Sequence, residues 1–210
     1  GNDHACSRLD HGLECWGQNN YGQLEIPQGI DKIQSLHTGA RHTCVTTPDG
    51  LRCWGAGEQG TTGLYEYGQS IVPDHVHNPS GVALGWNHSC VIENGQVSCW
   101  GYNEFGQLDI PEDIVNPHQI VAGAHHTCVI ADSGVHCWGA GKTDEGGYPQ
   151  AGQSIVPASV THPSAIGLGN AHTCALQDNQ IYCWGEGAWG QLDIPEIEGA
   201  IDLFAVGRLF

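Results

Sequence analysis

One signature recurs five times along this chain and constrains its fold more than any other feature. Each copy reads His-x-Cys, then eight residues, then Cys-Trp-Gly, and the first cysteines stand at positions 6, 44, 90, 128 and 174. The steps between these cysteines alternate between 38 and 46 residues. A supersecondary unit repeated at this period is typical of a repeat architecture. We therefore treat residues 1–210 as a single repeat domain.

The residues inside each copy predict a β-hairpin. In the third copy, Asn94-Gly95 is typical of a type I′ turn, because both central positions need φ > 0. Counting outward from this turn places Cys90 opposite Cys99 at a non-hydrogen-bonded pair, where Cα atoms lie roughly 4.5 Å apart. A disulfide tolerates that distance. The other four bends are compatible with three- or four-residue turns, so their register stays open at this point.

All ten cysteines belong to a repeat, and none is left over. Five hairpin disulfides formed in an oxidising compartment are the simplest interpretation. Zinc binding is the alternative, but the chain has no Cys-x-x-Cys knuckle. The predicted pairs are Cys6 with Cys15, Cys44 with Cys53, Cys90 with Cys99, Cys128 with Cys137, and Cys174 with Cys183.

The hydrophobic pattern around each signature predicts four short strands and no amphipathic helix. An apolar run such as 119–123 forms the first strand, the hairpin forms the next two, and an Ile-Pro or Val-Pro segment forms an outer strand. About 40 residues in four antiparallel strands, repeated radially, make a propeller blade. The fold class is therefore all-β, a five-bladed β-propeller. The first repeat lacks its first strand, so we expect the strand at 200–207 to pair with the N-terminal blade and close the ring.

The composition of the chain limits its possible cellular location and its possible classes of partner. The chain has 6 basic and 23 acidic residues, a net charge of -17, which argues against nucleic acid and anionic membranes as partners. No segment has the roughly 18 apolar residues of a membrane span. The chain begins without a signal peptide, so we expect a mature, processed form. The predicted location is secreted or extracellular, with the periplasm and the cell surface as further options.

The pattern Gly-x-x-His-x-Cys, Cys-Trp-Gly and Gly-Gln-Leu resembles the regulator of chromosome condensation repeat family, in particular its secreted branch with short repeats. This resemblance covers essentially the whole chain and implies a β-propeller, usually of seven blades, whereas five repeats are visible here. It also extends to a secreted β-lactamase inhibitor, in which loop residues, including the two positions before the histidine, contact the target. The nuclear member of the family binds chromatin and a small GTPase, and the acidic charge and paired cysteines argue against transferring that function.

The repeated polar and aromatic positions are interpreted first as structural. One tryptophan per repeat predicts packing between blades. The Gly-Gln glutamines are expected to satisfy backbone groups between blades. The five signature histidines are expected to hydrogen-bond a neighbouring blade; the alternative is an axial ring that binds a metal or an anion. His125-His126 and His75-x-His77 are weaker metal candidates, and we predict no metal and no cofactor.

Catalytic motifs do not emerge from the sequence. The chain lacks a free cysteine nucleophile, a Gly-x-Ser-x-Gly elbow and a Gly-rich phosphate loop that opens a helix. We therefore expect a protein that is not an enzyme.

Strand direction predicts where a ligand binds. Alternate loops of an antiparallel sheet emerge on the same face, so the Gly-x-x-His turns and the loops after Cys-Trp-Gly should share one face. Aromatic residues and arginine on loops of a rigid scaffold are typical of recognition sites. An alternative is that Tyr21, Phe105 and Trp189 only cap the core. The predicted binding face comprises Asp3, Tyr21, Arg41, Tyr65, Tyr67, Trp86, Asn87, Phe105, His125, Tyr148, Asn170 and Trp189, with Glu93 and Gln177 on the opposite face.

Three functions fit these features. The first is a secreted, non-catalytic binding protein that recognises an extracellular protein or glycan, and it includes an inhibitor of a secreted enzyme. The second is a structural protein whose seam strand pairs between chains to form homo-oligomers or filaments. The third, an enzyme that uses the axial pocket, has the least support.

Overall fold

The computed structural model describes residues 1–10, 12–58, 63–143 and 148–196, and this part of the chain is all-β with fourteen strands. One two-stranded and four three-stranded antiparallel sheets follow one another in sequence order. The strands are β1 (His4–Leu9), β2 (Gly12–Gly17), β3 (Ser35–Thr38), β4 (His42–Thr47), β5 (Gly50–Gly55), β6 (Gly81–Leu84), β7 (His88–Glu93), β8 (Gln96–Gly101), β9 (Pro117–Ala122), β10 (His126–Ala131), β11 (Gly134–Gly139), β12 (Ala165–Leu168), β13 (His172–Gln177) and β14 (Gln180–Gly185). No helix in the described residues is long and apolar enough to cross a membrane.

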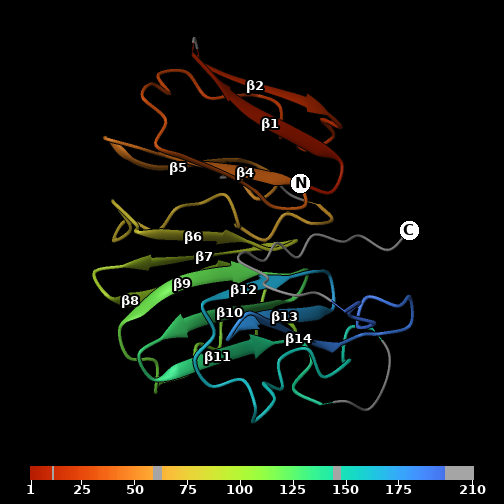
Figure 1. The fold of residues 1–210 in the computed structure, drawn as a ribbon. Helices are drawn as coiled ribbons and strands as arrows, with labels where there is room; N and C mark the ends of the chain where they lie inside the picture. The colour runs from red at the N-terminus through yellow and green to blue at the C-terminus, as the bar shows by residue number, and fades with distance from the viewer. Residues whose placement is uncertain (11, 59–62, 144–147, 197–210) are drawn as a thin grey trace.

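The red β1–β2 pair lies at the top of Figure 1, and the green β9–β11 and blue β12–β14 sheets lie together at the bottom, where they overlap in this view. Contacts between successive sheets are made largely through the strands β3, β6, β9 and β12. Each of these comes first in its sheet, before the hairpin. Strand order and direction therefore bring the Gly-x-x-His turn that follows each of them to the same end of every sheet.

The hairpin register agrees with the prediction for the third copy, where Cys90 lies opposite Cys99 and Glu93 opposite Gln96. The other four hairpins keep the same cysteine register. Asn94 and Asp178 both have positive φ, 52° and 53°, as a type I′ turn requires. All five disulfides are formed, each with a Cα–Cα distance of 4.1 Å, and no free cysteine exists.

The predicted fourth strand is wrong for the described residues, in which no sheet has more than three strands. The Ile-Pro segments instead make tight local turns. The amide of Asp109 donates to the Gly106 carbonyl and that of Ile110 to the Leu108 carbonyl, and equivalent bonds form at 25–26 and 193–194. These donors are used locally, and proline has no N–H to offer a neighbouring strand. The segment therefore covers the sheet without pairing with it.

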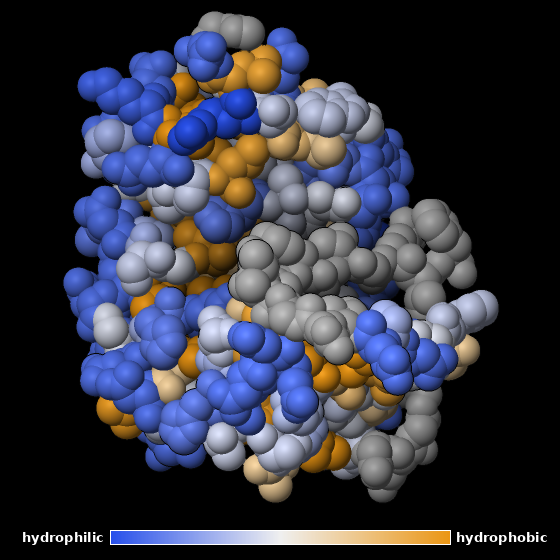
Figure 2. Space-filling model, viewed as in Figure 1, coloured by the Kyte–Doolittle hydropathy of each residue, from blue (hydrophilic) through white to orange (hydrophobic). Residues whose placement is uncertain are grey.

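The core lies between neighbouring sheets. One cluster joins Cys44 and Val76 of the second repeat to Val91 and Trp100 of the third. The next joins Cys90 and Ile92 to Val129 and Trp138 in the same way. A disulfide of one sheet and the tryptophan of the next recur in both clusters. Figure 2 shows this arrangement from outside, with hydrophilic residues along the outer edges of the sheets and hydrophobic atoms between them.

Closure of a five-bladed ring stays a prediction, because the proposed seam strand at 200–207 lies outside the described residues. The first sheet has two strands, as expected from the missing first strand of its repeat. Its tryptophan, Trp16, is 56% exposed, whereas the four equivalent tryptophans are between 0% and 8% exposed. The side of the first sheet that carries Trp16 is therefore open to solvent, whereas the equivalent side of each other sheet packs against a neighbouring sheet.

Candidate binding face

The signature histidines connect each sheet to the next, which confirms the structural interpretation for four of the five. Nε2 of each of these four histidines is hydrogen bonded, at 2.8 to 3.0 Å, to a side-chain hydroxyl in the next repeat. That hydroxyl belongs to the threonine or serine directly after the signature histidine. The Thr173 hydroxyl also donates to the Gln153 carbonyl. Because a hydroxyl has one proton, His126 must donate from Nε2. The pairs are His4 with Thr43, His42 with Ser89, His88 with Thr127, and His126 with Thr173.

The side chains of the Gly-Gln glutamines bond within their own loops and not, as had been expected, between blades. Their side-chain Oε1 accepts from a backbone N–H two residues earlier in their own loop, as in the 2.9 Å bond from Phe105 to Gln107. The backbone carbonyl, not the side chain, reaches the next sheet. It accepts from a tryptophan, as in the 2.8 Å bond from Trp138 Nε1 to Gln107. All five glutamines therefore shape their own loops, and the carbonyls of four of them, Gln23, Gln69, Gln107 and Gln153, also bind the neighbouring sheet.

The two predicted loop sets share one face, here called the loop face. The amide after Cys-Trp-Gly donates to the carbonyl of the residue before the signature histidine. Tyr102 donates to Asn87, and Ala140 donates to His125, both at 2.8 Å. Turns of neighbouring sheets also bond each other, since the Trp86 amide donates to the Ala124 carbonyl at 3.1 Å. The scaffold thus holds the loop-face side chains on a hydrogen-bonded framework.

Six rings form a continuous chain across this face, here called the aromatic cluster. Tyr67 and Tyr102 lie 4.4 Å apart, and Tyr102 and Phe105 lie 6.0 Å apart between ring centroids. Phe105 and His125 follow at 5.0 Å. His125 then lies 5.1 Å from Trp86 and 5.7 Å from Tyr148. Five of these six residues were predicted for the binding face, and the structure brings them together from three repeats.

Tyr102 was missed by the sequence analysis. It stands directly after Cys-Trp-Gly, at a position that strand direction already assigns to the loop face, but the other repeats have Gln18, Ala56, Ala140 or Glu186 there. No repeated aromatic marked the position. The available signal was its place in the loop rather than its residue type.

A second group on the loop face is centred on Arg41. Its guanidinium lies 3.8 Å from the centroid of the Tyr65 ring and 5.8 Å from that of Tyr21. The two tyrosine rings meet edge to face at 6.1 Å. A guanidinium over an aromatic face is a cation–π contact. Tyr21 and Phe105 thus both make ring contacts with other residues of the loop face.

Several polar atoms of the loop face are buried without a hydrogen-bond partner. They include Nε1 of Trp86, Oδ1 of Asn87 and Nδ1 of His125. Asn87 is 5% and His125 8% exposed. Burial lowers the pKa of His125 to about 4, so its ring is neutral near pH 7. Burial, together with the carboxylate of Glu186, raises the pKa of Tyr148 to about 12. The cluster therefore combines neutral rings with unsatisfied polar atoms.

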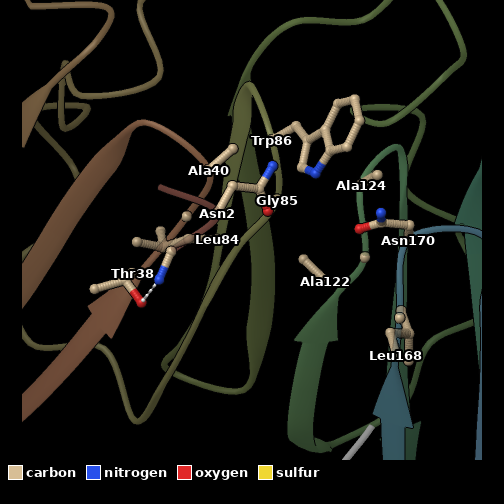
Figure 3. A pocket seen from close by; sticks show the side chains of 14 residues that line it. Asn2, Thr38, Ala40, Leu84, Gly85, Trp86, Ala122, Ala124, Leu168 and Asn170 are labelled. Atoms are coloured by element: carbon tan, nitrogen blue, oxygen red, sulfur yellow. Dashed lines mark hydrogen bonds between the residues drawn. The ribbon is translucent and has the colours of Figure 1, made fainter. Parts of the chain in front are cut away.

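The remaining predicted residues lie elsewhere on the face. Asn170 lines a cavity of about 360 Å³ at the ends of β3, β6, β9 and β12, where Asn2 and Trp86 also stand (Figure 3). The Asp3 carbonyl accepts the amide of Gln18. Trp189 is 67% exposed. These three residues take no part in the described ring contacts.

Metal candidates find no support in the described part of the chain, which contains no group of three or more potential ligands. His125 packs within the aromatic cluster while His126 is bonded to Thr173, so the two rings make different contacts. His75 is bonded to Ser98.

The predicted opposite-face residues have structural roles of their own. The Glu93 carboxylate accepts the amides of His77 and Asn78, and Gln177 Oε1 accepts those of Thr161 and His162. Substitution at either position would disturb a loop. Gln96, exposed at the start of β8, is a better opposite-face control.

A family model for the regulator of chromosome condensation (RCC1) repeat matches residues 80–107, which span the third hairpin and its Gly-Gln loop. The other four copies repeat the same signature. The third repeat is therefore similar to the RCC1 repeat. No curated protein matches the sequence of the chain significantly.

Several solved structures have a fold similar to that of this chain. The Arabidopsis thaliana receptor kinase ACR4 CRINKLY WD40 ectodomain has a TM-score of 0.66 at 25% identity, over 98% of this chain and 70% of that one. The entire ectodomain of the Physcomitrella patens receptor kinase CR4 has a TM-score of 0.64 at 21% identity, over 88% of this chain and 48% of that ectodomain. Prp20p from Saccharomyces cerevisiae, studied for its binding to Gsp1p and histones, has a TM-score of 0.65 at 19% identity. The match covers 94% of this chain and 59% of Prp20p. The chain thus spans about half the length of the moss ectodomain.

Proposed function

We propose that this chain is an extracellular, non-catalytic binding protein whose loop face recognises a protein partner. The observation that carries the proposal is the aromatic cluster, in which six rings from three repeats meet on a rigid framework. Aromatic side chains supply large contact area at low entropic cost and dominate binding energy at interfaces. Five disulfides and two ectodomains among the similar structures favour an extracellular location.

The same surface would serve an inhibitor of a secreted enzyme, because both roles need a rigid patch of anchor residues. A glycan is the other ligand class that aromatic loops accept. Tyr148 is 48% and Tyr67 40% exposed, so both ends of the aromatic cluster are open to solvent. We place a protein partner first because tryptophan and tyrosine, here Trp86 and Tyr148 in ring contact at 6.1 Å, are the anchor residues that dominate protein–protein interfaces.

Affinity capture tests this proposal. Immobilised wild-type protein is incubated with the extracellular proteins of its own source, and bound proteins are identified by mass spectrometry. We expect a partner that Gln96→Ala still captures and that Trp86→Ala and Tyr148→Ala both lose. Each cluster variant should weaken binding by at least about 1 kcal/mol. Unchanged melting temperatures would show that the variants are folded. A partner that all variants retain would place the binding site elsewhere.

Self-assembly is a second candidate function, and the exposed Trp16 favours it, since its equivalents are buried between sheets. A second copy could cover this side of the first sheet. Sedimentation over a range of concentrations measures the assembly directly. A single species at the 22.4 kDa chain mass would contradict self-assembly.

A further inference from the structure

The chain contains two versions of one loop-face site, related by the 84-residue step of its paired repeats. Arg41 and His125 occupy the same position, directly before a signature histidine, and Tyr21 and Phe105 occupy the same position before a Gly-Gln pair. The structure places each pair in contact or near contact: the Arg41 guanidinium is 5.8 Å from the Tyr21 ring, and the His125 and Phe105 rings are 5.0 Å apart. The two sites therefore correspond at these two positions, whereas Tyr65 of the first site corresponds to Pro149 in the second.

The first site is filled by the chain's own cation. The Arg41 guanidinium lies over the Tyr65 ring at 3.8 Å, with Tyr21 beside it. One of its nitrogens, Nη1, is buried and has no hydrogen-bond partner. The ring quadrupole stabilises a cation placed in this way.

The second site has more aromatic surface and no such cation among the described residues. His125 replaces the arginine, and the rings of Phe105, Trp86 and Tyr148 lie within 5.0 to 5.7 Å of it. The Glu186 carboxylate lies close enough to Tyr148 to raise the pKa of that phenol. The nearby Lys142 directs its Nζ to Gly106, where an Asp109 carboxylate oxygen also lies.

Polar atoms of the second site also lack partners. Nδ1 of His125, a residue only 8% exposed, and Nε1 of Trp86 are both buried and unpaired. A neutral imidazole whose Nε2 carries the proton offers Nδ1 as an acceptor, and the indole Nε1 offers a donor. Both atoms are enclosed in the structure, so the contact with a ligand at the cluster surface is made by the ring faces.

We propose that the aromatic cluster around His125 takes the side chain of an arginine or lysine from a protein partner. The partner's cation lies on the solvent side of this cluster, against the rings of Trp86, Phe105 and Tyr148, as the Arg41 guanidinium lies on the Tyr65 ring in the first site. The chain's 23 acidic and 6 basic residues favour the approach of a basic segment. This inference rests on the proposed function, because it names the chemistry that the loop face recognises.

A peptide pair tests the inference directly. The probes are two capped pentapeptides, Gly-Gly-Arg-Gly-Gly and its analogue with citrulline, which has nearly the shape of arginine but no charge. Binding is measured by NMR titration, which reports millimolar Kd values. We expect the arginine peptide to bind at least about 5-fold more tightly than the citrulline peptide, within the roughly 2- to 30-fold range of a cation–π contact.

Matched variants locate the effect. His125→Arg places the chain's own cation in the second site, as in the first, and should abolish the preference for arginine. Gln96→Arg makes the same change in net charge on the opposite face and should preserve it. Phe105→Leu removes one ring with little change in size and should weaken the preference. Phe105→Leu also covers the case in which His125→Arg does not fold.

Three results would overturn the inference: equal binding of the two peptides, no binding of either at millimolar concentration, or a preference that persists in His125→Arg and Phe105→Leu. None of them decides whether the loop face binds a protein. That question depends on the affinity capture with Trp86→Ala, so the two proposals can fail separately.

Discussion

At the scale of single residues, the signature histidines show how one side chain stabilises a junction between sheets. His88 is fully buried, and its Nε2 is bonded at 2.8 Å to Thr127 of the next sheet. Burial lowers the pKa of His42, His88 and His126 to about 3. In the unfolded chain a histidine titrates near 6.5. Between these pKa values the unfolded state binds protons that the folded state does not.

These shifts predict acid destabilisation with a definite sign. The stabilisation is complete above pH 6.5 and is lost as the pH falls toward 3, because the unfolded state gains protons. Each of the three histidines should lower the free energy of unfolding by about 1–2 kcal/mol between pH 7 and pH 5. Urea unfolding at several pH values measures this slope. His88→Gln has no titrating ring and should reduce the slope by about one histidine; an unchanged slope would contradict the assignment.

At the scale of elements, the glycine of each Gly-x-x-His turn determines how closely two sheets approach. A Cβ on Gly85 would lie 2.1 Å from Cε1 of His88 and 2.9 Å from the carbonyl oxygen of Gly123. Gly95, in the hairpin turn, has φ of +74° and open space around its Cβ position. One glycine is needed for packing and the other for backbone conformation.

We expect Gly85→Ala to destabilise the protein by about 3 kcal/mol, because the histidine or the neighbouring turn must move. Gly95→Ala should cost only about 1 kcal/mol, since it strains one turn residue. Chemical denaturation of the two variants compares them directly. Equal losses would show that the Gly-x-x-His turn tolerates a side chain.

The disulfides act on the same hairpin elements. Each closes a loop of sequence separation 9, so each should stabilise the fold by about 2–3 kcal/mol on the loop-entropy model. Replacing both Cys90 and Cys99 by serine should lower the denaturation midpoint accordingly. Thiol titration of the denatured, unreduced wild type should detect essentially no thiol, and several reactive thiols would contradict the disulfide framework.

At the scale of the whole molecule, stability comes from junctions between sheets, and the described residues form four of them. The repeat tryptophan reports on each junction: Trp100 is 8% exposed and donates to the Gln69 carbonyl at 2.9 Å, whereas Trp16 is 56% exposed. The loop face is built across these same junctions, because Phe105 and His125 come from successive repeats. Assembly of the sheets and assembly of the candidate site are therefore coupled.

This difference predicts how the two tryptophans respond to truncation. Trp100→Ala should cost about 3–5 kcal/mol, as expected for a buried aromatic. Trp16→Ala should cost less than about 1 kcal/mol, because its surface is already in water. Melting curves of the two variants make the comparison. A large loss for Trp16→Ala would mean that another sheet, from this chain or from a second copy, packs on the first sheet in solution.

The amino-acid sequence by itself determined the repeat, the all-β class, the disulfide pairs and the register of the third hairpin. These features depend on local spacing: Asn94-Gly95 needs two positive φ values, and alternation then places Cys90 opposite Cys99. Strand direction also assigned most of the site to one face. The prediction of an outer strand was wrong because the backbone amides of the Ile-Pro segments donate to carbonyls in local turns. An apolar sequence pattern does not show whether an amide bonds within a turn or to a neighbouring strand.

Only the tertiary structure decided which side chains of the loop face meet. Tyr67, Tyr102, Phe105, His125 and Trp86 lie in three repeats, and their contacts depend on the distance and angle between neighbouring sheets. That geometry is set by packing at the sheet junctions, where the histidine–hydroxyl bonds and the Gly-x-x-His turns meet. The burial of His125, and with it the neutral ring that replaces the cation of Arg41, likewise arises only when the sheets are assembled.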